Sequence, residues 1–273
     1  DVALKNEQQV FKRIKPGLAP LLSPPPSFPR FTAANGPSPV IAGFGPAGLF
    51  AALTLARSGL KPIVLERGEA VEKRARTVET FSSGGALDTE SNIQFGEGGA
   101  GAFSDGKLTT GIKDKRCQLI LQELFSHGAP EEILYLAHPH IGTDRLPRII
   151  SNICEAIIAA GGEIHFNSKV SGFILRNGRM CGVEVGDEHI EGAAVILATG
   201  HSAKDIYHTL HHDGVRLEAK AFAMGVRIEH PQRLIDSIQY HMPERGDYLP
   251  AAAYSLVNQI EGRGVYSFCM CPG

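Results

Sequence analysis

The stretch that most constrains the fold of this chain is a glycine-rich turn between a strand pattern and a helix pattern. The apolar run Val40–Ala42 leads into Gly43, Gly45 and Gly48, spaced as G-x-G-x-x-G, and helical apolar spacing follows. In this context the first glycine allows a sharp turn, the second lets a pyrophosphate approach the backbone, and the third lets the helix pack closely on the sheet. Pro46 suits the first turn of a helix, where free N–H groups and the helix dipole favour an anion. This stretch predicts dinucleotide binding.

An acidic residue ends the second expected strand. Glu66 follows residues 62–65 at about the 20-residue spacing from the glycine turn that is typical of a ribose-binding carboxylate. A carboxylate accepts hydrogen bonds from two ribose hydroxyls and repels a 2′-phosphate, so the sequence favours FAD or NAD over NADP. The alternative is a glycine-rich loop in a Rossmann-like domain that binds another ligand or none.

Composition and charge narrow the class of protein. The 273 residues include 27 basic and 29 acidic side chains, and this balance does not indicate a broad nucleic-acid-binding surface. No run of 18 or more apolar residues is present, so we expect no membrane span. Five scattered cysteines favour a reducing compartment over a disulfide scaffold. The expected location is the cytoplasm, or the plastid stroma in a plant or alga.

The chain is expected to divide into five segments. It begins at Asp1 with no leader pattern, which suggests that it has been processed, trimmed or cut from a longer protein. The expected segments are an N-terminal segment with a proline-rich linker (1–37), the first part of the nucleotide-binding domain (38–112), a helical segment (113–140), the second part of that domain (141–210) and an incomplete substrate domain (211–273).

Helix and strand patterns alternate through the nucleotide-binding segments. Apolar spacing predicts a helix at 69–81 and another at 145–160, and a short strand at 163–166 follows. Arg74 lies on the first of these helices. It could bind a pyrophosphate with two hydrogen bonds, or it could lie on a solvated helix face.

The later part of the chain has a period of two. Residues 169–190 predict a three-stranded β-meander, with turns at Asn177–Gly178 and Gly186–Asp187. An apolar strand at 194–198 follows. Two further strands of another sheet are expected at 226–230 and 265–269.

Residues 91–108 form a second glycine-rich stretch. Five glycines occur between Gly96 and Gly106 without any strand or helix period. Such a permissive backbone is kept where a ligand or another backbone comes close, although a flexible surface loop is the alternative. Because Phe95, Phe103 and Leu108 punctuate the stretch, we expect it to be packed.

Several motifs resemble one known family. The order of elements resembles the FAD-binding domain of the glutathione-reductase-like flavoproteins. Within these, residues 91–108 (SNIQFGEGGAGAFSDGKL), 140–146 (HIGTDRL), 225–230 (GVRIEH) and 266–273 (YSFCMCPG) resemble a family of uncharacterised FAD-dependent dehydrogenases of bacteria and plastid-bearing organisms. The resemblance covers about residues 38–273. It implies an α/β fold: a Rossmann-like FAD-binding domain with a three-stranded β-meander, plus part of a second α+β substrate domain.

The resemblance also implies FAD as cofactor and a role for particular residues. The glycine turn would hold the pyrophosphate, Glu66 the ribose, and the backbone of Val170 the adenine. Thr199 and Gly200 would pass close to the cofactor, and Gly98–Gly101 would lie along the flavin. The implied cofactor-binding residues are Gly43, Gly45, Pro46, Ala47, Gly48, Glu66, Arg67, Arg74, Gly98, Gly99, Ala100, Gly101, Ser104, Val170, Thr199 and Gly200.

Five residues are candidates for catalysis. By the resemblance Asp105 and Lys107 lie near the isoalloxazine, where they would polarise or protonate a substrate or bind the flavin. His201 follows a strand end, where ligand crevices lie. Cys269 and Cys271 could form a redox pair, or they could be two small residues on one strand face.

A cluster of histidines is expected to carry no metal. His208, His211 and His212 fall within about one helical turn, but cysteine and carboxylate ligands do not obviously converge on them, so a solvated face is the expectation.

These observations favour a flavin oxidoreductase of dehydrogenase type that acts on a small-molecule substrate or electron donor. The alternatives are an NAD-dependent dehydrogenase and a non-catalytic FAD-binding assembly factor. Neither a nucleic-acid partner nor a membrane span is expected. Because the late glycine-rich segment that binds the ribityl chain in such flavoproteins is not found, we expect a C-terminal remainder of the same protein to be needed.

Overall fold

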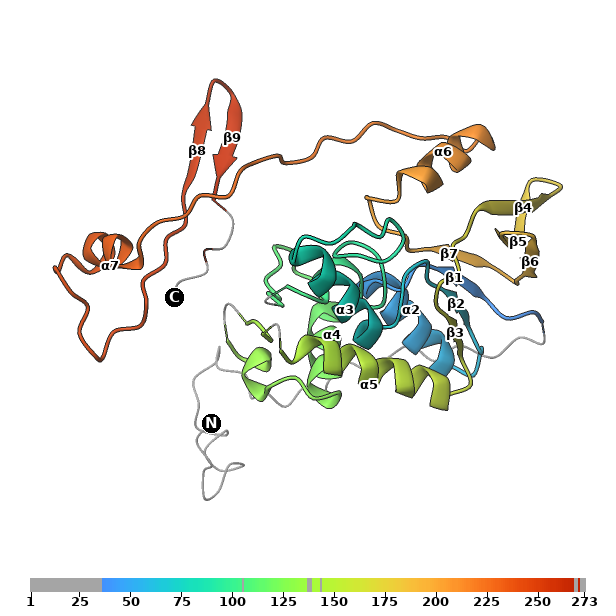
Figure 1. Cartoon of the computed structure of the whole chain (residues 1–273), viewed down its shortest axis with the longest axis horizontal. Helices are drawn as coiled ribbons and strands as arrows, with labels where there is room; N and C mark the ends of the chain where they lie inside the picture. Colours follow the sequence, from blue (N-terminus) through green and yellow to red (C-terminus); the bar gives the residue numbers. More distant parts are fainter. Residues whose placement is uncertain (1–35, 105, 137–138, 143, 268–269, 271–273) are drawn as a thin grey trace, which may run out of the picture. The chain divides into compact units, whose positions relative to one another are not determined.

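The computed structural model describes residues 36–104, 106–136, 139–142, 144–267 and 270. The chain divides into two compact units, the first ending at Leu217 and the second beginning at Glu218. Figure 1 shows the elements in chain order. Three of the predicted catalytic residues lie outside the described residues: Asp105, Cys269 and Cys271.

A four-stranded parallel sheet forms the centre of the first unit. Its strands lie in the order β3-β2-β1-β7. The central strand β1 pairs in parallel with β2 on one side and with β7 on the other. The strands are β1 (Val40–Ala42), β2 (Ile63–Leu65), β3 (Glu163–His165) and β7 (Val195–Leu197). The predicted α/β fold with a parallel sheet is confirmed.

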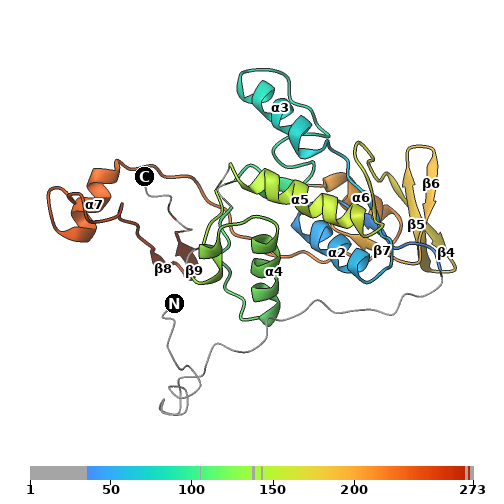
Figure 2. The same ribbon diagram turned by 90° about the horizontal axis from the view of Figure 1, so that it is seen from below.

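Two helices cover one face of this sheet. Helix α2 (Pro46–Arg57) connects β1 to β2, and α5 (Leu146–Ala159) precedes β3. The two helices lie side by side in both ribbon views (Figures 1 and 2). Ile41 from the sheet and Ile153 from α5 are fully buried in the core between these layers. The apolar spacing predicted for residues 145–160 is therefore the buried face of α5.

The opposite face of the sheet carries a smaller core. Val40 and Ala42 alternate with Ile41 along β1, and they pack with Val183 and Ile206 in a second cluster. These partners come from an antiparallel β-meander and from helix α6. The elements are β4 (Gly172–Arg176), β5 (Arg179–Val185), β6 (Glu188–Glu191) and α6 (Lys204–His212). The meander occupies the predicted residues.

The second glycine-rich stretch is packed, as predicted. Glu97 is 2% exposed and Ala102 is fully buried, and the N–H of Gly98 donates to the carbonyl of Phe44 at 2.9 Å. The stretch lies between helices α3 (Val71–Ser82) and α4 (Lys115–Ser126), and it contains the short 3-10 turn η1 (Gly99–Gly101). A second 3-10 turn, η2 (Glu131–Leu134), follows α4.

The second unit contains one helix and one hairpin. These are α7 (Gln232–Tyr240), β8 (Val257–Ile260) and β9 (Arg263–Tyr266). The carboxylate of Asp236 on α7 accepts hydrogen bonds from the N–H of Ala252 and the amide of Gln232, at 2.8 and 2.7 Å. The bond from Ala252 ties the helix to the segment before the hairpin, and the amide of Gln232 also donates to the carbonyl of Ala252 at 2.9 Å.

The prediction of a strand at 226–230 is wrong. These residues form no strand, and the side chains of Val226 and Ile228 are 87% and 67% exposed. An alternating pattern becomes a strand only with a hydrogen-bonding neighbour, and the described residues supply none here. The strand expected from residue 265 begins earlier instead, as β9. No helix among the described residues is long and apolar enough to cross a membrane.

Candidate functional site

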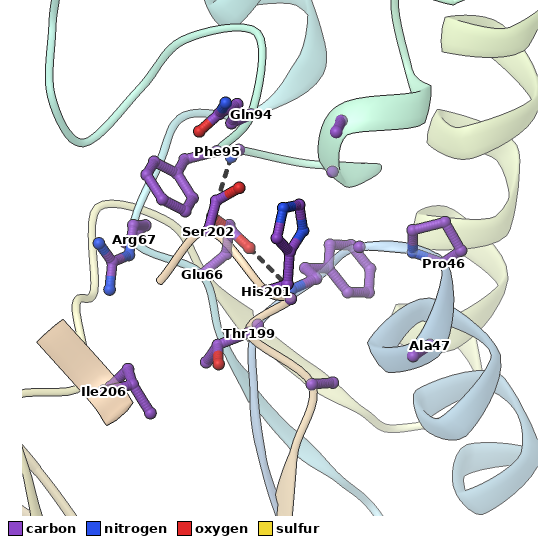
Figure 3. A pocket seen from close by; sticks show the side chains of 18 of the residues that line it. Pro46, Ala47, Glu66, Arg67, Gln94, Phe95, Thr199, His201, Ser202 and Ile206 are labelled. Atoms are coloured by element: carbon purple, nitrogen blue, oxygen red, sulfur yellow. Dashed lines mark hydrogen bonds between the residues drawn. The ribbon is translucent and has the colours of Figure 1, made fainter. Parts of the chain in front are cut away.

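A cavity of about 540 Å³ opens where strands β1, β2 and β7 end (Figure 3). Its volume is within the range of about 300 to 1,000 Å³ that is typical of small-molecule sites. Ligands of open α/β sheets bind in such a crevice beyond the carboxyl ends of the strands. Its lining includes most of the predicted residues: Gly43, Gly45, Pro46, Ala47, Glu66, Arg67, Gly99, Ala100, Gly101, Val170, Thr199, Gly200 and His201.

The start of helix α2 forms one wall of the cavity. Gly45 is the N-cap residue, and no side chain among the described residues caps this helix. Pro46 at the next position has no N–H, and the first turn contains no acidic residue. The backbone N–H groups of Ala47 and Gly48 have no partner within the helix, because the first turn of any helix leaves them unpaired. With the positive end of the helix dipole, this turn is suited to bind an anion.

Glycine is required in this turn for the packing of α2. A Cβ atom at Gly48 would overlap the carbonyl oxygen of Gly43. Gly43 has a positive φ of 99°, and a Cβ atom there would lie 2.5 Å from the carbonyl oxygen of Ala198 in the segment after β7. The helix, the turn and the end of β7 therefore approach one another more closely than side chains permit.

The turn η1 forms the adjoining wall. A Cβ atom on Gly99 would lie 2.9 Å from the Cα atom of Gly45, so the two glycine-rich turns are in direct contact. Ala100 and Gly101 continue along the cavity. The two glycine-rich stretches thus form one site, although about 50 residues separate them in the chain.

Glu66 lies in the cavity wall and is only 4% exposed. Its Oε2 accepts a hydrogen bond from the N–H of Phe44 at 2.7 Å, and its Oε1 accepts bonds from Gly68 and Gly96 at 3.0 Å each. Figure 3 shows two of these bonds. A carboxylate accepts about four hydrogen bonds, so about one acceptor position remains. Three backbone donors thus leave less room on Glu66 than the two ribose hydroxyls of the sequence prediction would need.

Arg67 occupies the end of the cavity near α6. Its guanidinium lies 4.6 Å from the centre of the Phe95 ring and donates to both carboxylate oxygens of Asp205. Lys169 also contacts Asp205, at 3.2 Å. Burial raises the pKa of the Asp205 carboxyl, but the hydrogen bonds from these two cations outweigh it and leave the pKa below its ordinary value. Asp205 is therefore ionised at neutral pH and holds α6 against the end of β2.

Two family models match this chain. Residues 38–147 match the FAD binding domain, and residues 221–273 match the "FAD-dependent protein, C-terminal domain-like" family. The first match covers the cavity walls formed by α2, Glu66 and η1. Residues 38–147 are therefore an FAD-binding domain. FAD is accordingly the cofactor.

One curated relative of this flavoprotein is an uncharacterized protein of Clostridium beijerinckii. It is 56% identical over 237 residues, which cover 86% of this chain and 44% of the relative. The chain thus spans less than half the length of the curated relative that it matches.

Solved structures similar to the flavoprotein domain are distant. THI4 of Thermovibrio ammonificans is 18% identical with a TM-score of 0.43, over 66% of this chain and 64% of that one. Glycerol-3-phosphate dehydrogenase of Bacillus halodurans complexed with FAD is 14% identical with a TM-score of 0.42, over 65% and 37%. Thioredoxin reductase of Lactococcus lactis is 19% identical with a TM-score of 0.34, over 60% and 36%. The FAD-binding domain is identified by the family models and not by these distant structures.

Arg74 of the flavoprotein does not take the predicted position. Its side chain is fully buried and is not among the residues that line the cavity. Burial lowers the pKa of the guanidinium to about 10, and the nearby carboxyl groups of Glu66 and Glu97 oppose this shift. The guanidinium binds backbone carbonyls of the glycine-rich stretch. Neither predicted role, on a pyrophosphate or on a solvated face, agrees with this position.

A buried carboxyl group lies behind η1. Oε2 of Glu97 accepts a hydrogen bond from the N–H of Val71 at 2.8 Å, at the start of α3. Burial raises the pKa of Glu97, and the bonds from Val71 and from the thiol of Cys154 offset this only in part. Burial also raises the pKa of Cys154 to about 12, so this thiol stays protonated and unreactive.

Besides Arg74, four predicted residues that the structure describes lie outside the cavity lining. Gly48 and Gly98 are packing positions, since a Cβ atom on Gly98 would overlap the side chain of Ile150. Ser104 donates to the carbonyl of Gly101 and accepts from the N–H of Gly106. Lys107 forms a β-bridge with His140. Of the predicted catalytic residues that the structure describes, His201 lines the cavity and Lys107 does not.

Sequence reasoning missed several residues of the site. Phe44 and Phe95 lie inside the two glycine-rich motifs, where the sequence predicts packing for Phe95 and no role for Phe44. Ser202 and Ile206 follow the predicted strand end, and no local signal marks them. The lining residues not predicted are Phe44, Leu65, Gln94, Phe95, Gly96, Leu197, Ala198, Ser202 and Ile206.

Proposed function

We propose that this chain supplies the cofactor-binding part of an FAD-dependent oxidoreductase of dehydrogenase type. The observation that carries the proposal is the uncapped first turn of α2, which shares one cavity with the carboxylate of Glu66. An anion-binding helix start and a ribose acceptor are what the adenosine diphosphate half of FAD requires. The contact between the two glycine-rich turns adds a wall without side chains, along which a flat ring can lie.

Each residue of the cavity has a role in this proposal. The start of α2, with the N–H of Ala47 on the cavity wall, holds the pyrophosphate. Glu66 accepts from one ribose hydroxyl, and the backbone at Val170 contacts the adenine. Gly99–Gly101 lie along the flavin side. Thr199 and Gly200 pass close to the cofactor at the end of β7.

The bound FAD supplies hydride or electron transfer, while the protein supplies binding, orientation and exclusion of water. His201 carries an exposed imidazole on the cavity wall, where it contacts the substrate or the cofactor. The substrate is a small molecule or electron donor that the longer protein binds. Roles for Lys107, Asp105, Cys269 and Cys271 remain predictions.

The test is the visible absorption spectrum of the purified full-length protein and of two variants at Ala47. This side chain is exposed on the cavity wall, so a longer one fits without disturbing the core. Ala47→Glu places a negative charge beside the expected pyrophosphate, and acidic residues stabilise the first turn of a helix, so the variant folds. We expect about a hundredfold weaker FAD binding, because like charges in contact cost several kcal/mol. Ala47→Gln is the matched uncharged control.

Three results would count against the proposal in different ways. Equal FAD affinity of the Ala47→Glu variant and the wild type would show that the pyrophosphate does not bind at this wall. A colourless wild-type protein that binds NAD in calorimetry would favour the NAD-dependent dehydrogenase. A yellow protein whose flavin no donor reduces, with nicotinamide nucleotides among those tried, would be the non-catalytic FAD-binding factor.

A further inference from the structure

Among the residues that the structure describes, Arg74 is the largest side chain that is fully buried. A buried guanidinium is unfavourable unless its N–H groups all find acceptors. Its acceptors in this structure are main-chain carbonyls rather than carboxylates. Nε donates to Asn92 at 2.8 Å, Nη1 to Glu97 at 2.6 Å, and Nη2 to Ile93 and Gly99 at 2.9 Å each.

These four carbonyls belong to one stretch of backbone, in which the short turn η1 is the only helix or strand among the described residues. The planar guanidinium also lies 4.9 Å from the centre of the Phe103 ring, which fixes the plane of its N–H groups. A Cβ atom on Gly96 would overlap the aliphatic stem of Arg74. The stretch is therefore wrapped closely around this one side chain.

The same stretch forms the cavity wall. Gly96 and Gly99 line the cavity, and the N–H of Gly96 donates to Glu66. One set of backbone groups thus faces Arg74 while its neighbours face the cofactor site. The conformation that satisfies the guanidinium is the conformation that brings Gly99 against Gly45.

We propose that Arg74 is a positioning residue, which holds the backbone of residues 92–99 in the shape that completes the FAD cavity. The inference rests on the proposed function in taking FAD as the occupant. Lysine cannot replace arginine here, because an ammonium group is a single point with three donors, whereas the guanidinium is a rigid fork that reaches four carbonyls. The side chain acts before the cofactor arrives and never touches it.

The first measurement is amide hydrogen exchange of the cofactor-free full-length protein. Arg74→Lys is compared with Arg76→Lys, the same substitution at an exposed position on the same helix. We expect exchange in residues 92–101 to become at least about tenfold faster in Arg74→Lys alone, because hydrogen bonds to a charged group are lost. Exchange in α2 and α5 should stay at the wild-type rate.

The second measurement is FAD affinity, read from flavin fluorescence, together with the circular dichroism of the bound flavin. Arg74→Lys should bind FAD about tenfold more weakly, with an altered dichroism spectrum, and Arg76→Lys should match the wild type. A direct phosphate ligand would instead leave exchange in the cofactor-free protein unchanged, and this result would overturn the proposal. If the wild type binds no FAD, the proposed function fails, and the exchange experiment still decides the role of Arg74.

A second variant covers the case in which Arg74→Lys fails to fold. Phe103→Leu keeps a side chain of similar size and removes only the stacked ring. We expect the same two effects in the same direction, at about half the size on a logarithmic scale, since the stack contributes less than the hydrogen bonds. Unchanged exchange in residues 92–101 of this variant would contradict the role of Arg74.

Discussion

The carboxylate of Glu66 accepts a hydrogen bond from the backbone N–H of Gly96, 30 residues further along the chain. The same carboxylate accepts from the N–H of Phe44 in the turn before α2. One buried side chain at the end of β2 therefore joins both glycine-rich turns. It organises the cavity as well as offering an acceptor to a ligand.

Replacing Glu66 with glutamine should destabilise the fold even without a cofactor. The amide nitrogen of Gln cannot accept a hydrogen bond, so at least the N–H of Phe44 or those of Gly68 and Gly96 lose their acceptor. An unsatisfied buried donor costs about 1 to 3 kcal/mol. We expect the free energy of unfolding in urea to fall by about 2 kcal/mol. Glu79→Gln, at an exposed position on α3, should change it by less than about 0.5 kcal/mol.

Alanine at Gly48 should be harmful although alanine is the better helix former. The helix propensity alone favours Gly48→Ala by about 1 kcal/mol. The overlap of the new Cβ atom with the carbonyl oxygen of Gly43 forces α2 away from the turn, and such overpacking costs about 1 to 3 kcal/mol. We expect a lower melting temperature and loss of FAD.

The control for this prediction is Gly111→Ala. A Cβ atom there has no neighbour within 4 Å, and the residue is exposed. Its melting temperature should equal or exceed that of the wild type. A Gly48→Ala protein that is as stable as this control would show that α2 does not need its close approach to Gly43.

The stability should depend on pH through Glu97. Burial raises the pKa of its carboxyl group above the ordinary value of 4.5. The folded state therefore holds the proton more tightly than the unfolded state, so this contribution is fully present below about pH 4.5 and is lost as the pH rises through the folded-state pKa. Glu97→Gln keeps the acceptor for Val71 without a charge.

Urea unfolding of the wild type and of Glu97→Gln at several pH values tests this prediction. The stability of Glu97→Gln relative to the wild type should increase as the pH rises from about 4.5. Glu155→Gln, at an exposed position on α5, should show a constant difference. A constant difference for Glu97→Gln as well would mean that this carboxyl group titrates alike in both states.

The sequence predicted those parts of the fold that local patterns determine. The spacing of Gly43, Gly45 and Gly48 predicts the turn before α2, because a chain that turns from strand to helix over an anion needs glycine at these positions. The meander followed from Asn177–Gly178 and a period of two, and α5 from its isoleucines. The packing of residues 91–108 was inferred from the aromatic residues within the stretch.

Other features depend on partners that no local pattern shows. A lone Arg74 on a helix looks the same in sequence whether it meets a phosphate, water or four carbonyls. The three N–H groups on Glu66 come from segments up to 30 residues away. Residues 226–230 have the period of two that is typical of a strand. Such a segment forms a strand only where a neighbouring strand supplies hydrogen bonds. In each case the missing information is the identity of a neighbour that is distant in sequence.

The position of β1 sets an order of events during synthesis on the ribosome. β1 and β7 are neighbours in the sheet, yet roughly 150 residues separate them in the chain. At a translation rate of about 5 to 20 residues per second, β1 leaves the ribosome about 8 to 30 seconds before this partner. One edge of the central strand stays unpaired throughout that interval and is open to association with other chains. Slow codons ahead of Val195 would lengthen the interval and lower the yield of soluble protein, with no change in any side chain.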